Sequence, residues 1–283
     1  MNDTATEIRA WLRLTRCPGV TPSAARALLS SFGPPQEVLS ASASQLGRFV
    51  DPMVAAALRA APAPELECAI EEALAWCSRP RTRFIALDDP DYPRQVLETP
   101  DPPFYLFVRG DPELLLRPQL ALLISREANS DGVRTARDFA QALCDRNLTL
   151  LWELESLTHF TSLRKLSIRN SLAVDSRGLR AEGEGIAGTL VSAQTPGQMR
   201  AERGHGGPNP LLAALCRAIL VVQGGKSSPI WHTARLGAEW GRDILAIPGS
   251  IHSPLSKASH RLIKEGAKLV ESSDDIFAEL AGF

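Results

Sequence analysis

The stretch that decides the fold is residues 118–143, PQLALLISREANSDGVRTARDFAQAL. It opens with the apolar run Leu120–Ile124, which is typical of a β-strand buried on both faces of a parallel sheet. A polar turn, Ser125–Gly132, then leads into a segment whose apolar residues repeat at the helical period of 3.6. These apolar residues are Val133, Ala136, Phe139, Ala140 and Leu143. The stretch therefore predicts a strand, a turn that suits a phosphate and a helix, which together form the repeating unit of doubly wound proteins.

Further short apolar runs have the same character and predict additional strands of one mostly parallel sheet. They are Leu148–Leu151, Ser171–Val174, Thr189–Val191, Ala218–Val222 and Ile244–Ile247. A helix over Thr233–Trp240 separates the last two of these strands, as a parallel crossover requires. We therefore predict an α/β protein with an extended, Rossmann-like, doubly wound sheet.

The composition is that of a globular protein. The 283 residues are 44% hydrophobic, which is enough for a sizeable core. Lys and Arg number 31 and Asp and Glu number 32, so the net charge is −1 and a polyanion must be met by a local basic patch. No apolar run reaches the ~18 residues of a membrane span, and charges interrupt residues 1–15 where a signal peptide is apolar. We expect a cytoplasmic protein with no membrane partner.

Cysteine and histidine spacing argues against a metal or redox centre. The five cysteines are scattered and none belongs to a CxxC pair, so we expect reduced packing residues. No two histidines fall at HxxxH or HExxH spacing, and no serine stands in a GxSxG turn. The sequence therefore predicts no metal ligand, no cofactor and no catalytic residue.

The N-terminal residues predict a small bundle of helices. Thr6–Leu14 and Pro22–Phe32 have helical patterns and are joined by Cys17–Val20, whose proline and glycine end the first helix. Thr21 is expected to cap the second helix. Such a pair is typical of a helix–hairpin–helix or SAM-like module, whose hairpin N–H groups bind a nucleic-acid phosphate, but also of an ordinary αα-corner. Both interpretations stay open.

Two closely spaced prolines in Ala61–Pro64 stiffen the chain and mark a domain boundary. Beyond it, Glu65–Trp76 has the pattern of an amphipathic helix, and Arg83–Leu87 and Phe104–Arg109 have the pattern of strands. We predict three parts. They are a helical domain over 1–62, a linker helix with the segment leading into the sheet over 63–117, and a Rossmann-like domain over 118–283.

Two sets of residues match the order and spacing of one known family. The first set runs up to Ser125-Arg126 and contains Tyr92-Pro93, Leu97, Asp101-Pro102-Pro103, Leu106 and Arg109-Gly110. The second set contains Ala218–Val222, Thr233–Trp240, Pro248-Gly249-Ser250, Leu262-Ile263, Gly266-Ala267 and Asp274-Asp275-Ile276. Together the sets span roughly two-thirds of the chain. On these residues the sequence resembles the DprA/Smf family of DNA-processing proteins.

The resemblance implies an extended Rossmann-like domain that binds single-stranded DNA and forms a homodimer. It also implies a role in natural transformation and homologous recombination, in which the family helps to load the RecA recombinase onto DNA. The family is not known for turning over a substrate. We therefore expect a binding protein rather than an enzyme.

The turns expected to bind anions differ from the family pattern. The family's Gly-Ser-Arg turn is Ile124-Ser125-Arg126 here, so a side chain stands where backbone approaches phosphate. The family's glycine-rich turn after the second strand is Trp152–His159 here, with two glutamates and no glycine. A family stretch with two arginines is Gly207–Pro210 here, with none. We interpret the chain as a divergent member whose scaffold is kept and whose anion-binding turns are rewritten.

Candidate DNA-binding residues fall into two groups. Ser125 and Arg126 follow the central strand, and Ser228 and Thr233 match a serine- and threonine-containing turn of the family. We expect Arg126 to pair with phosphate, with Ser125 beside it and the N-terminus of the next helix adding its dipole. The second group is a basic cluster formed by Arg164, Lys165 and Arg169. It either follows the DNA backbone or is the solvated face of a helix, and both interpretations stay open.

Two other functions stay open. One is a nucleotide-processing enzyme, because DprA-like sheets look like those of the lysine-decarboxylase-like phosphoribohydrolases. Those enzymes carry a PGGxGTxxE motif, which does not follow Pro248-Gly249-Ser250 here. The other is a degenerate relative that keeps the fold and has lost DNA binding, as the missing glycines and arginines indicate.

Overall fold

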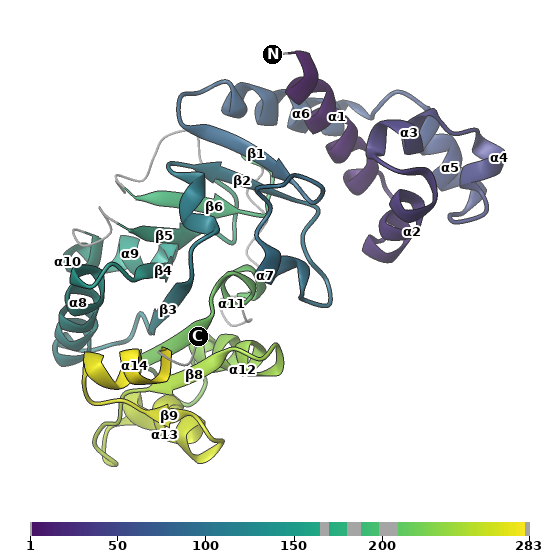
Figure 1. Ribbon diagram of the computed structural model, residues 1–283. Helices are drawn as coiled ribbons and strands as arrows, with labels where there is room; N and C mark the ends of the chain where they lie inside the picture. The colour runs from purple at the N-terminus through teal and green to yellow at the C-terminus, as the bar shows by residue number, and fades with distance from the viewer. Residues whose placement is uncertain (1, 165–169, 180–187, 198–208, 281–283) are drawn as a thin grey trace.

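A computed structural model describes residues 2–164, 170–179, 188–197 and 209–280, in which helices pack on both faces of one nine-stranded sheet (Figure 1). The strands are β1 Thr82–Ala86, β2 Tyr105–Arg109, β3 Gln119–Ile124, β4 Thr149–Glu153, β5 Ser171–Val174, β6 Thr189–Ser192, β7 Ala218–Gln223, β8 Asp243–Ala246 and β9 Lys268–Leu269. The α-helices are α1 Asn2–Arg16, α2 Pro22–Phe32, α3 Pro35–Ser40, α4 Ala43–Leu46, α5 Pro52–Arg59, α6 Pro64–Cys77, α7 Arg94–Leu97, α8 Ser130–Asp145, α9 Leu154–His159, α10 Thr161–Arg164, α11 Pro210–Leu215, α12 Pro229–Glu239, α13 Lys257–Lys264 and α14 Ser273–Leu280. Short 3-10 helices lie at η1 Pro112–Leu115 and η2 Pro254–Ser256.

The sheet has the order β1-β2-β6-β5-β4-β3-β7-β8-β9. From β6 to β9 every neighbouring pair is parallel, while β1 and β2 add an antiparallel edge. The chain leaves β3 toward β4 on one side and returns to β7 on the other, so the strand order reverses at β3. The predicted doubly wound, mostly parallel sheet is therefore confirmed, and its ligand crevice is expected at this reversal.

The central strand β3 is buried along its whole length, as the apolar run predicts. Leu120, Leu122 and Ile124 pack on one face of the sheet, in a core that includes apolar residues of α1, α6, α8 and α9. Ala121 and Leu123 pack on the opposite face, against apolar residues of α11, α12 and α13. Because alternate side chains of a strand point to opposite faces, each face has its own core.

The first helices form a module with its own core, which Figure 1 shows beyond the β1 edge of the sheet. Leu14 and Leu28 are among the buried residues at its centre. The expected cap is confirmed, since the Thr21 hydroxyl accepts a hydrogen bond of 3.2 Å from the Ala24 N–H. Helix α1 also belongs to the main core, to which it contributes Trp11. Strands β1 and β2 of the sheet come from residues 63–117. The boundaries of the three parts stay a prediction.

The helices around the central turn begin earlier than the apolar pattern indicates. Helix α8 begins at Ser130 rather than near Gly132, because the Asn129 side chain accepts the N–H of Gly132 at 2.9 Å and starts the first turn. Helix α12 begins at Pro229, a residue that suits the first helical turn, rather than at Thr233. Both differences shorten the loops that follow the central strands.

Within the described residues, no helix combines the length and the apolar character needed to cross a membrane. All five cysteines are free, and Cys17 and Cys216 are buried in apolar cores, as expected of packing residues. Cys68 is exposed and does not fit that expectation.

Replacing Leu122 with alanine is expected to lower the free energy of unfolding by about 2–5 kcal/mol, because it leaves a cavity in the middle of β3. Urea denaturation followed by circular dichroism measures the change. The matched control is Leu116→Ala, since Leu116 is half exposed and its truncation should stay within about 0.5 kcal/mol of the parent. Equal losses for the two variants would contradict the assignment of β3 to the core.

Candidate functional site

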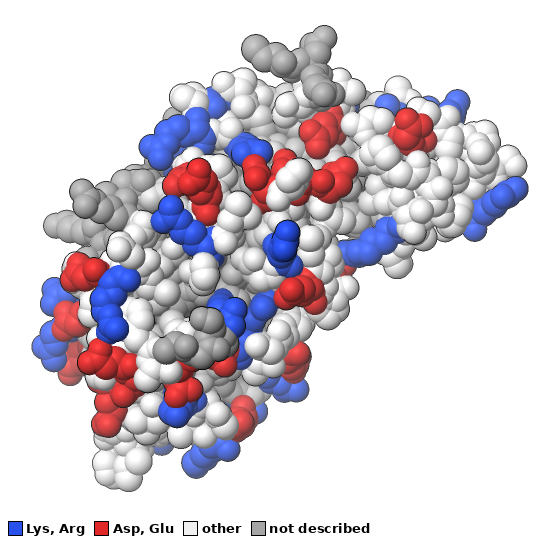
Figure 2. All heavy atoms as spheres, in the orientation of Figure 1, with Lys and Arg blue, Asp and Glu red and all other residues white. Residues whose placement is uncertain are grey.

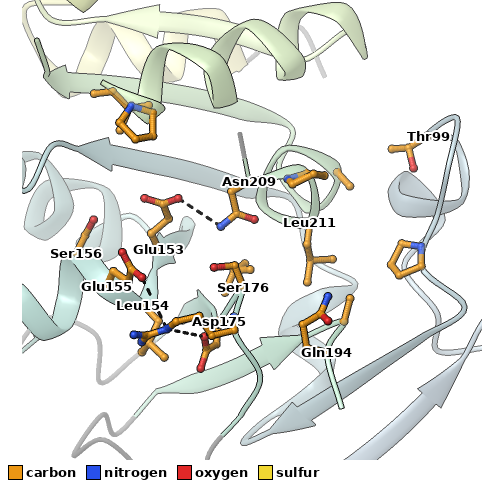
Figure 3. Close-up of a pocket in the computed structure, with 18 of the residues that line it drawn as sticks. Thr99, Glu153, Leu154, Glu155, Ser156, Asp175, Ser176, Gln194, Asn209 and Leu211 are labelled. Carbon is orange, nitrogen blue, oxygen red and sulfur yellow. Dashed lines mark hydrogen bonds and ion pairs between the residues drawn. The ribbon is translucent and has the colours of Figure 1, made fainter. Parts of the chain in front are cut away.

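A cleft of about 1360 Å³ runs along the carboxyl ends of the parallel strands. Its lining includes the residues that directly follow β3, β4, β5 and β7, together with the start of α11. The cleft therefore lies at the edge where open α/β sheets bind ligands, on both sides of the reversal at β3. Figure 3 looks into it, and most of the labelled side chains are polar, among them Glu153, Asp175 and Asn209.

The turn after β3 is tied to the end of β7. The Ser125 N–H donates to the Gln223 carbonyl at 2.9 Å, and the Asn129 N–H donates to the Gln223 side-chain oxygen at 3.0 Å. In return the Gln223 amide donates to the Asn129 side chain at 3.1 Å. The Ser125 hydroxyl accepts the Glu127 N–H at 3.3 Å. These bonds hold the turn in one shape while the Arg126 side chain, 47% exposed, stays on the cleft surface.

The end of β4 places a carboxylate on the floor of the cleft. Glu153 is half-buried, and its side chain accepts a hydrogen bond of 3.4 Å from the Asn209 amide (Figure 3). Burial raises the pKa of the Glu153 carboxyl, and the neighbouring Glu155 raises it further, against opposing effects of Asn209 and Arg126. Asn209 is itself held in place, because its side chain accepts the Leu212 N–H at the start of α11.

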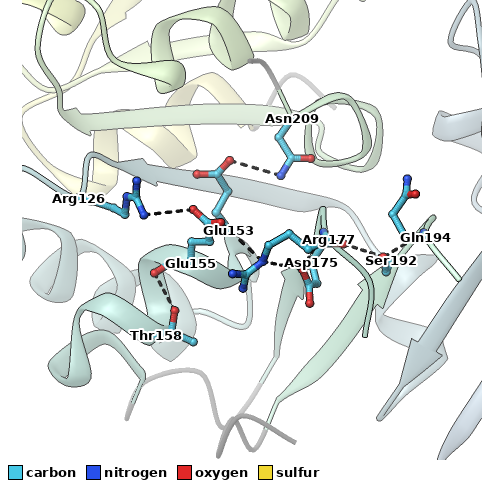
Figure 4. A network of polar contacts seen from close by, with 9 residues as sticks. All are labelled: Arg126, Glu153, Glu155, Thr158, Asp175, Arg177, Ser192, Gln194 and Asn209. Carbon is cyan, nitrogen blue, oxygen red and sulfur yellow. Dashed lines mark hydrogen bonds and ion pairs between the residues drawn. The ribbon is translucent and has the colours of Figure 1, made fainter. Parts of the chain in front are cut away.

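A chain of alternating charges crosses the floor of the cleft (Figure 4). The Glu155 carboxylate lies 3.7 Å from Arg126 on one side and 3.7 Å from Arg177 on the other. Arg177 also lies 3.6 Å from the carboxylate of Asp175, which is buried and accepts the Arg177 backbone N–H at 2.9 Å. These residues follow the neighbouring strands β3, β4 and β5, so the register of the sheet brings them together.

The loop after β7 forms the other side of the cleft. It contains Gly225, Lys226, Ser227 and Ser228, all of which line the cleft. Lys226 is exposed and forms no ion pair with the described residues. Ser228 is the N-cap residue of α12, and its buried hydroxyl has no hydrogen-bond partner in the described part of the chain. The loop therefore offers one cation and one unused hydroxyl beside the start of a helix.

The N-terminal module closes one end of the cleft through α2. Arg26 forms an ion pair of 2.6 Å with Asp101 and donates to the Pro102 carbonyl at 2.7 Å. Its guanidinium also lies over the Phe104 ring, 4.8 Å from the ring centre. All four residues line the cleft. Arg26 therefore fixes the module to the loop before β2, and its charge is partly matched by Asp101.

Among the residues that the sequence singles out, Ser125, Arg126 and Ser228 line the cleft. Thr233 is buried on α12 one layer behind it, where its hydroxyl accepts the Asn209 N–H at 3.0 Å and lies 3.3 Å from the Pro229 carbonyl. In the predicted basic cluster, the backbone of Arg164 ends α10, whereas its side chain and the whole of Lys165 and Arg169 lie outside the described residues.

The structure adds Arg177, Asp175 and Lys226 to the lining of the cleft. In the sequence Arg177 follows the basic cluster of Arg164, Lys165 and Arg169 and belongs to the same possible strand-following patch, with no sign that it reaches the cleft. A usable signal was its position, because it comes three residues after the buried strand β5, and the carboxyl end of each parallel strand reaches the ligand edge. Nothing in the sequence gave the distance from Arg177 to Glu155.

The described residues give no support to a metal site or a dinucleotide site. Within the described residues, no group of three or more histidine, cysteine or acidic side chains is arranged to hold a metal ion. Residues 183–188 have the GxGxxG spacing of a dinucleotide site, but that fingerprint directly follows a strand and opens a helix, whereas these glycines directly precede β6. Residues 183–187 themselves lie outside the described part of the chain.

A family model and individual relatives both match the same family of DNA-processing proteins. The sequence model of the family described as DNA recombination-mediator protein A matches residues 83–151 and 173–281. The protein Smf of Escherichia coli K12 is 32% identical over 228 residues, which are 75% of this chain and 60% of Smf, so the match leaves out a substantial part of that relative. The DNA processing protein DprA of Streptococcus pneumoniae is 31% identical over 69% of this chain and 73% of the relative.

Solved structures share the fold. The X-ray structure of DNA processing protein A from Streptococcus pneumoniae superposes with a TM-score of 0.75 at 24% identity, covering 94% of this chain and 95% of that one. The structure of DNA processing protein A from Helicobacter pylori superposes with a TM-score of 0.58 at 16% identity, covering 71% of this chain and 96% of that one. The latter is described as revealing a single-stranded DNA binding mode of the Helicobacter protein.

Replacing Glu153 with glutamine is expected to raise the melting temperature at pH 7–8. Because burial raises the pKa of this carboxyl in the folded protein, stability falls as the pH rises from the ordinary glutamate pKa of about 4.3 through the raised value. Glutamine removes the charge and keeps an oxygen for Asn209. The advantage should vanish below about pH 4, where the Glu153 carboxyl of the parent is protonated in both the folded and the unfolded protein.

Thermal melts of the parent and the variant across a pH series measure this effect. The control is Glu127→Gln, which removes an exposed charge from the same cleft and should change stability by no more than about 0.5 kcal/mol. A Glu153→Gln melting curve that follows the parent at every pH would contradict the expectation.

Proposed function

Because this chain belongs to the DNA recombination-mediator protein A family, the DprA/Smf proteins that process DNA in recombination, we propose that it binds single-stranded DNA in the cleft at the carboxyl edge of its sheet. One observation carries the proposal: Arg126 is held on the cleft surface at the reversal of strand order, where such sheets bind anions. The single-stranded DNA binding mode described for the Helicobacter pylori protein, which shares the fold, is consistent with it.

In this proposal Arg126 binds a backbone phosphate through charge-assisted hydrogen bonds. It makes no hydrogen bond with any described residue, so its guanidinium donors are available to a ligand. The N-terminus of α8, four residues further on, adds a favourable dipole for the phosphate. Lys226 is exposed in the same cleft, on the loop after β7, and supplies a second point of contact beside Ser228, whose unpartnered hydroxyl is buried.

The remaining predicted residues have less direct roles. Thr233 holds Asn209 and, through it, the floor of the cleft, so we assign it a positioning role. The basic cluster of Arg164, Lys165 and Arg169 stays a proposal for a flanking surface that follows the strand beyond the cleft.

Wider roles rest on the family rather than on the cleft. We propose that the protein acts in natural transformation and homologous recombination by helping to load the RecA recombinase onto single-stranded DNA. We further propose that it works as a homodimer in the cytoplasm, as a binding protein rather than as an enzyme. Co-sedimentation with RecA on DNA and analytical ultracentrifugation test these two parts independently of the DNA-binding assay.

The second candidate function is that of a divergent family member that keeps the fold and does not bind DNA. The observation that favours it is the acidic floor, where Glu153, Glu155 and Asp175 stand among the arginines. Basic and acidic side chains are also interspersed over the face of the molecule shown in Figure 2, so long-range attraction of a polyanion is weak. Direct measurement of binding separates the two candidates.

Replacing Arg126 with alanine is expected to weaken binding of a fluorescein-labelled single-stranded oligonucleotide by about 10-fold or more. A hydrogen bond to a charged group contributes about 1.5–3 kcal/mol, and 1.4 kcal/mol is 10-fold in Kd. The slope of log Kd against log salt should also become shallower by about 0.7 for each lost phosphate contact. Fluorescence anisotropy across a salt series measures both quantities.

The matched control is Arg235→Ala, which removes the same charge from an exposed arginine on α12 that lies outside the cleft lining. It should change Kd by less than about 2-fold, since it loses only weak long-range attraction. Equal weakening by both variants would show that only overall charge matters. Absence of binding at low salt, with the parent folded by circular dichroism, would favour the second candidate.

A further inference from the structure

The two arginines on the floor of the cleft face one carboxylate. Arg126 follows β3 and Arg177 follows β5, and the Glu155 carboxylate, at the start of α9 after β4, lies 3.7 Å from each of them (Figure 4). Two guanidinium groups on opposite sides of one anion are an arrangement that suits a phosphate, since each guanidinium donates several charge-assisted hydrogen bonds. Here the anion between them belongs to the protein itself.

We infer that Arg126 and Arg177 form a subsite for one phosphate of the DNA backbone and that Glu155 occupies this subsite until DNA displaces it. The inference rests on the proposed function, which it deepens by adding Arg177 as a phosphate ligand and Glu155 as an internal competitor. Glu155, the competitor, belongs to the turn after β4, which has two glutamates and no glycine.

The contacts of Glu155 are loose enough to be exchanged. At 3.7 Å both exceed the 2.7–3.2 Å range of a hydrogen bond, so the carboxylate neutralises the arginines without filling their donor positions. The side chains of Arg126, Glu155 and Arg177 are 47%, 34% and 27% exposed, so water screens the ion pairs and makes them weak. A phosphate, by contrast, accepts several charge-assisted hydrogen bonds at once.

The other carboxylate beside Arg177 has a different role. Asp175 is buried, accepts the Arg177 backbone N–H at 2.9 Å and lies 3.6 Å from its guanidinium. Its backbone is fixed as well, because its N–H donates to Val191 and its carbonyl accepts the Ser192 hydroxyl. Asp175 therefore stays in place and orients Arg177 toward the cleft. Glu155, with three side-chain torsions and a side chain that is 34% exposed, is the group that moves.

The chain offers a matched pair of glutamates with which to test this. Glu155→Gln and Glu127→Gln each remove one negative charge from the lining of the same cleft. Glu127 is exposed and forms no ion pair with any described residue, whereas Glu155 lies between the two arginines. If the effect is general electrostatics, the Kd for DNA changes alike in both variants. If DNA displaces Glu155 from a subsite, the Kd changes only in Glu155→Gln.

The experiment measures Kd for a labelled single-stranded oligonucleotide by anisotropy, across a salt series, for the parent, Glu155→Gln, Glu127→Gln and Arg177→Lys. We expect Glu155→Gln to tighten binding about 3- to 10-fold and Glu127→Gln to change it less than 2-fold. Arg177→Lys keeps the charge beside Asp175, and with it the fold, but loses the planar fork, so binding should weaken at least 3-fold. Circular dichroism melts confirm that each variant is folded.

Equal effects of the two glutamine variants, or unchanged binding by Arg177→Lys, would overturn the subsite while leaving DNA binding through Arg126 intact. If the parent does not bind and Glu155→Gln does, the inference is supported, because the internal carboxylate then blocks the site outright. If no variant binds at low salt, the subsite and the proposed function both fail.

Discussion

The parallel pairing of β3 with β4 on one side and β7 on the other is the constraint on which the rest of the structure depends. All strands from β6 to β9 then run in one direction, so their carboxyl ends meet at one edge. The loops after β3 and β7 diverge to opposite faces at that edge, and the cleft opens between them. Burial of β3 on both faces holds this arrangement, because apolar cores on each side of the sheet fix its register.

The same edge sets the electrostatic character of the cleft. Parallel neighbours place the residues after β3, β4 and β5 side by side, so the charges of Arg126, Glu155 and Arg177 meet although they are far apart in the chain. The result is a site in which the charges of Arg126 and Arg177 are partly neutralised by the protein's own Glu155. Such a site binds a polyanion less tightly than a purely basic groove, but its affinity depends on one side chain that a ligand can displace.

Much of the fold follows from the sequence, and less of the site does. Apolar runs predicted the inner strands because a parallel sheet buries them on both faces, as β3 illustrates. The same rule located Ser125 and Arg126 at the ligand edge. The pairing of Glu155 with Arg177 was not predictable, since it depends on the register between β4 and β5, which hydrophobic pattern alone does not give. Thr233 looked like a ligand contact because a matching turn does not reveal that α12 begins at Pro229 and buries it.

The most direct test of the proposal that DNA binds in the cleft is hydrogen–deuterium exchange measured by mass spectrometry with and without a saturating single-stranded oligonucleotide. If DNA occupies the cleft, amide exchange should slow in the peptides that follow the central strands, over 124–130, 153–158, 175–179 and 224–230. Exchange in α3 to α5, away from the cleft, should be unchanged. Protection confined to the helical module, with none after β3, β4 and β7, would contradict the placement of DNA at the carboxyl edge of the sheet.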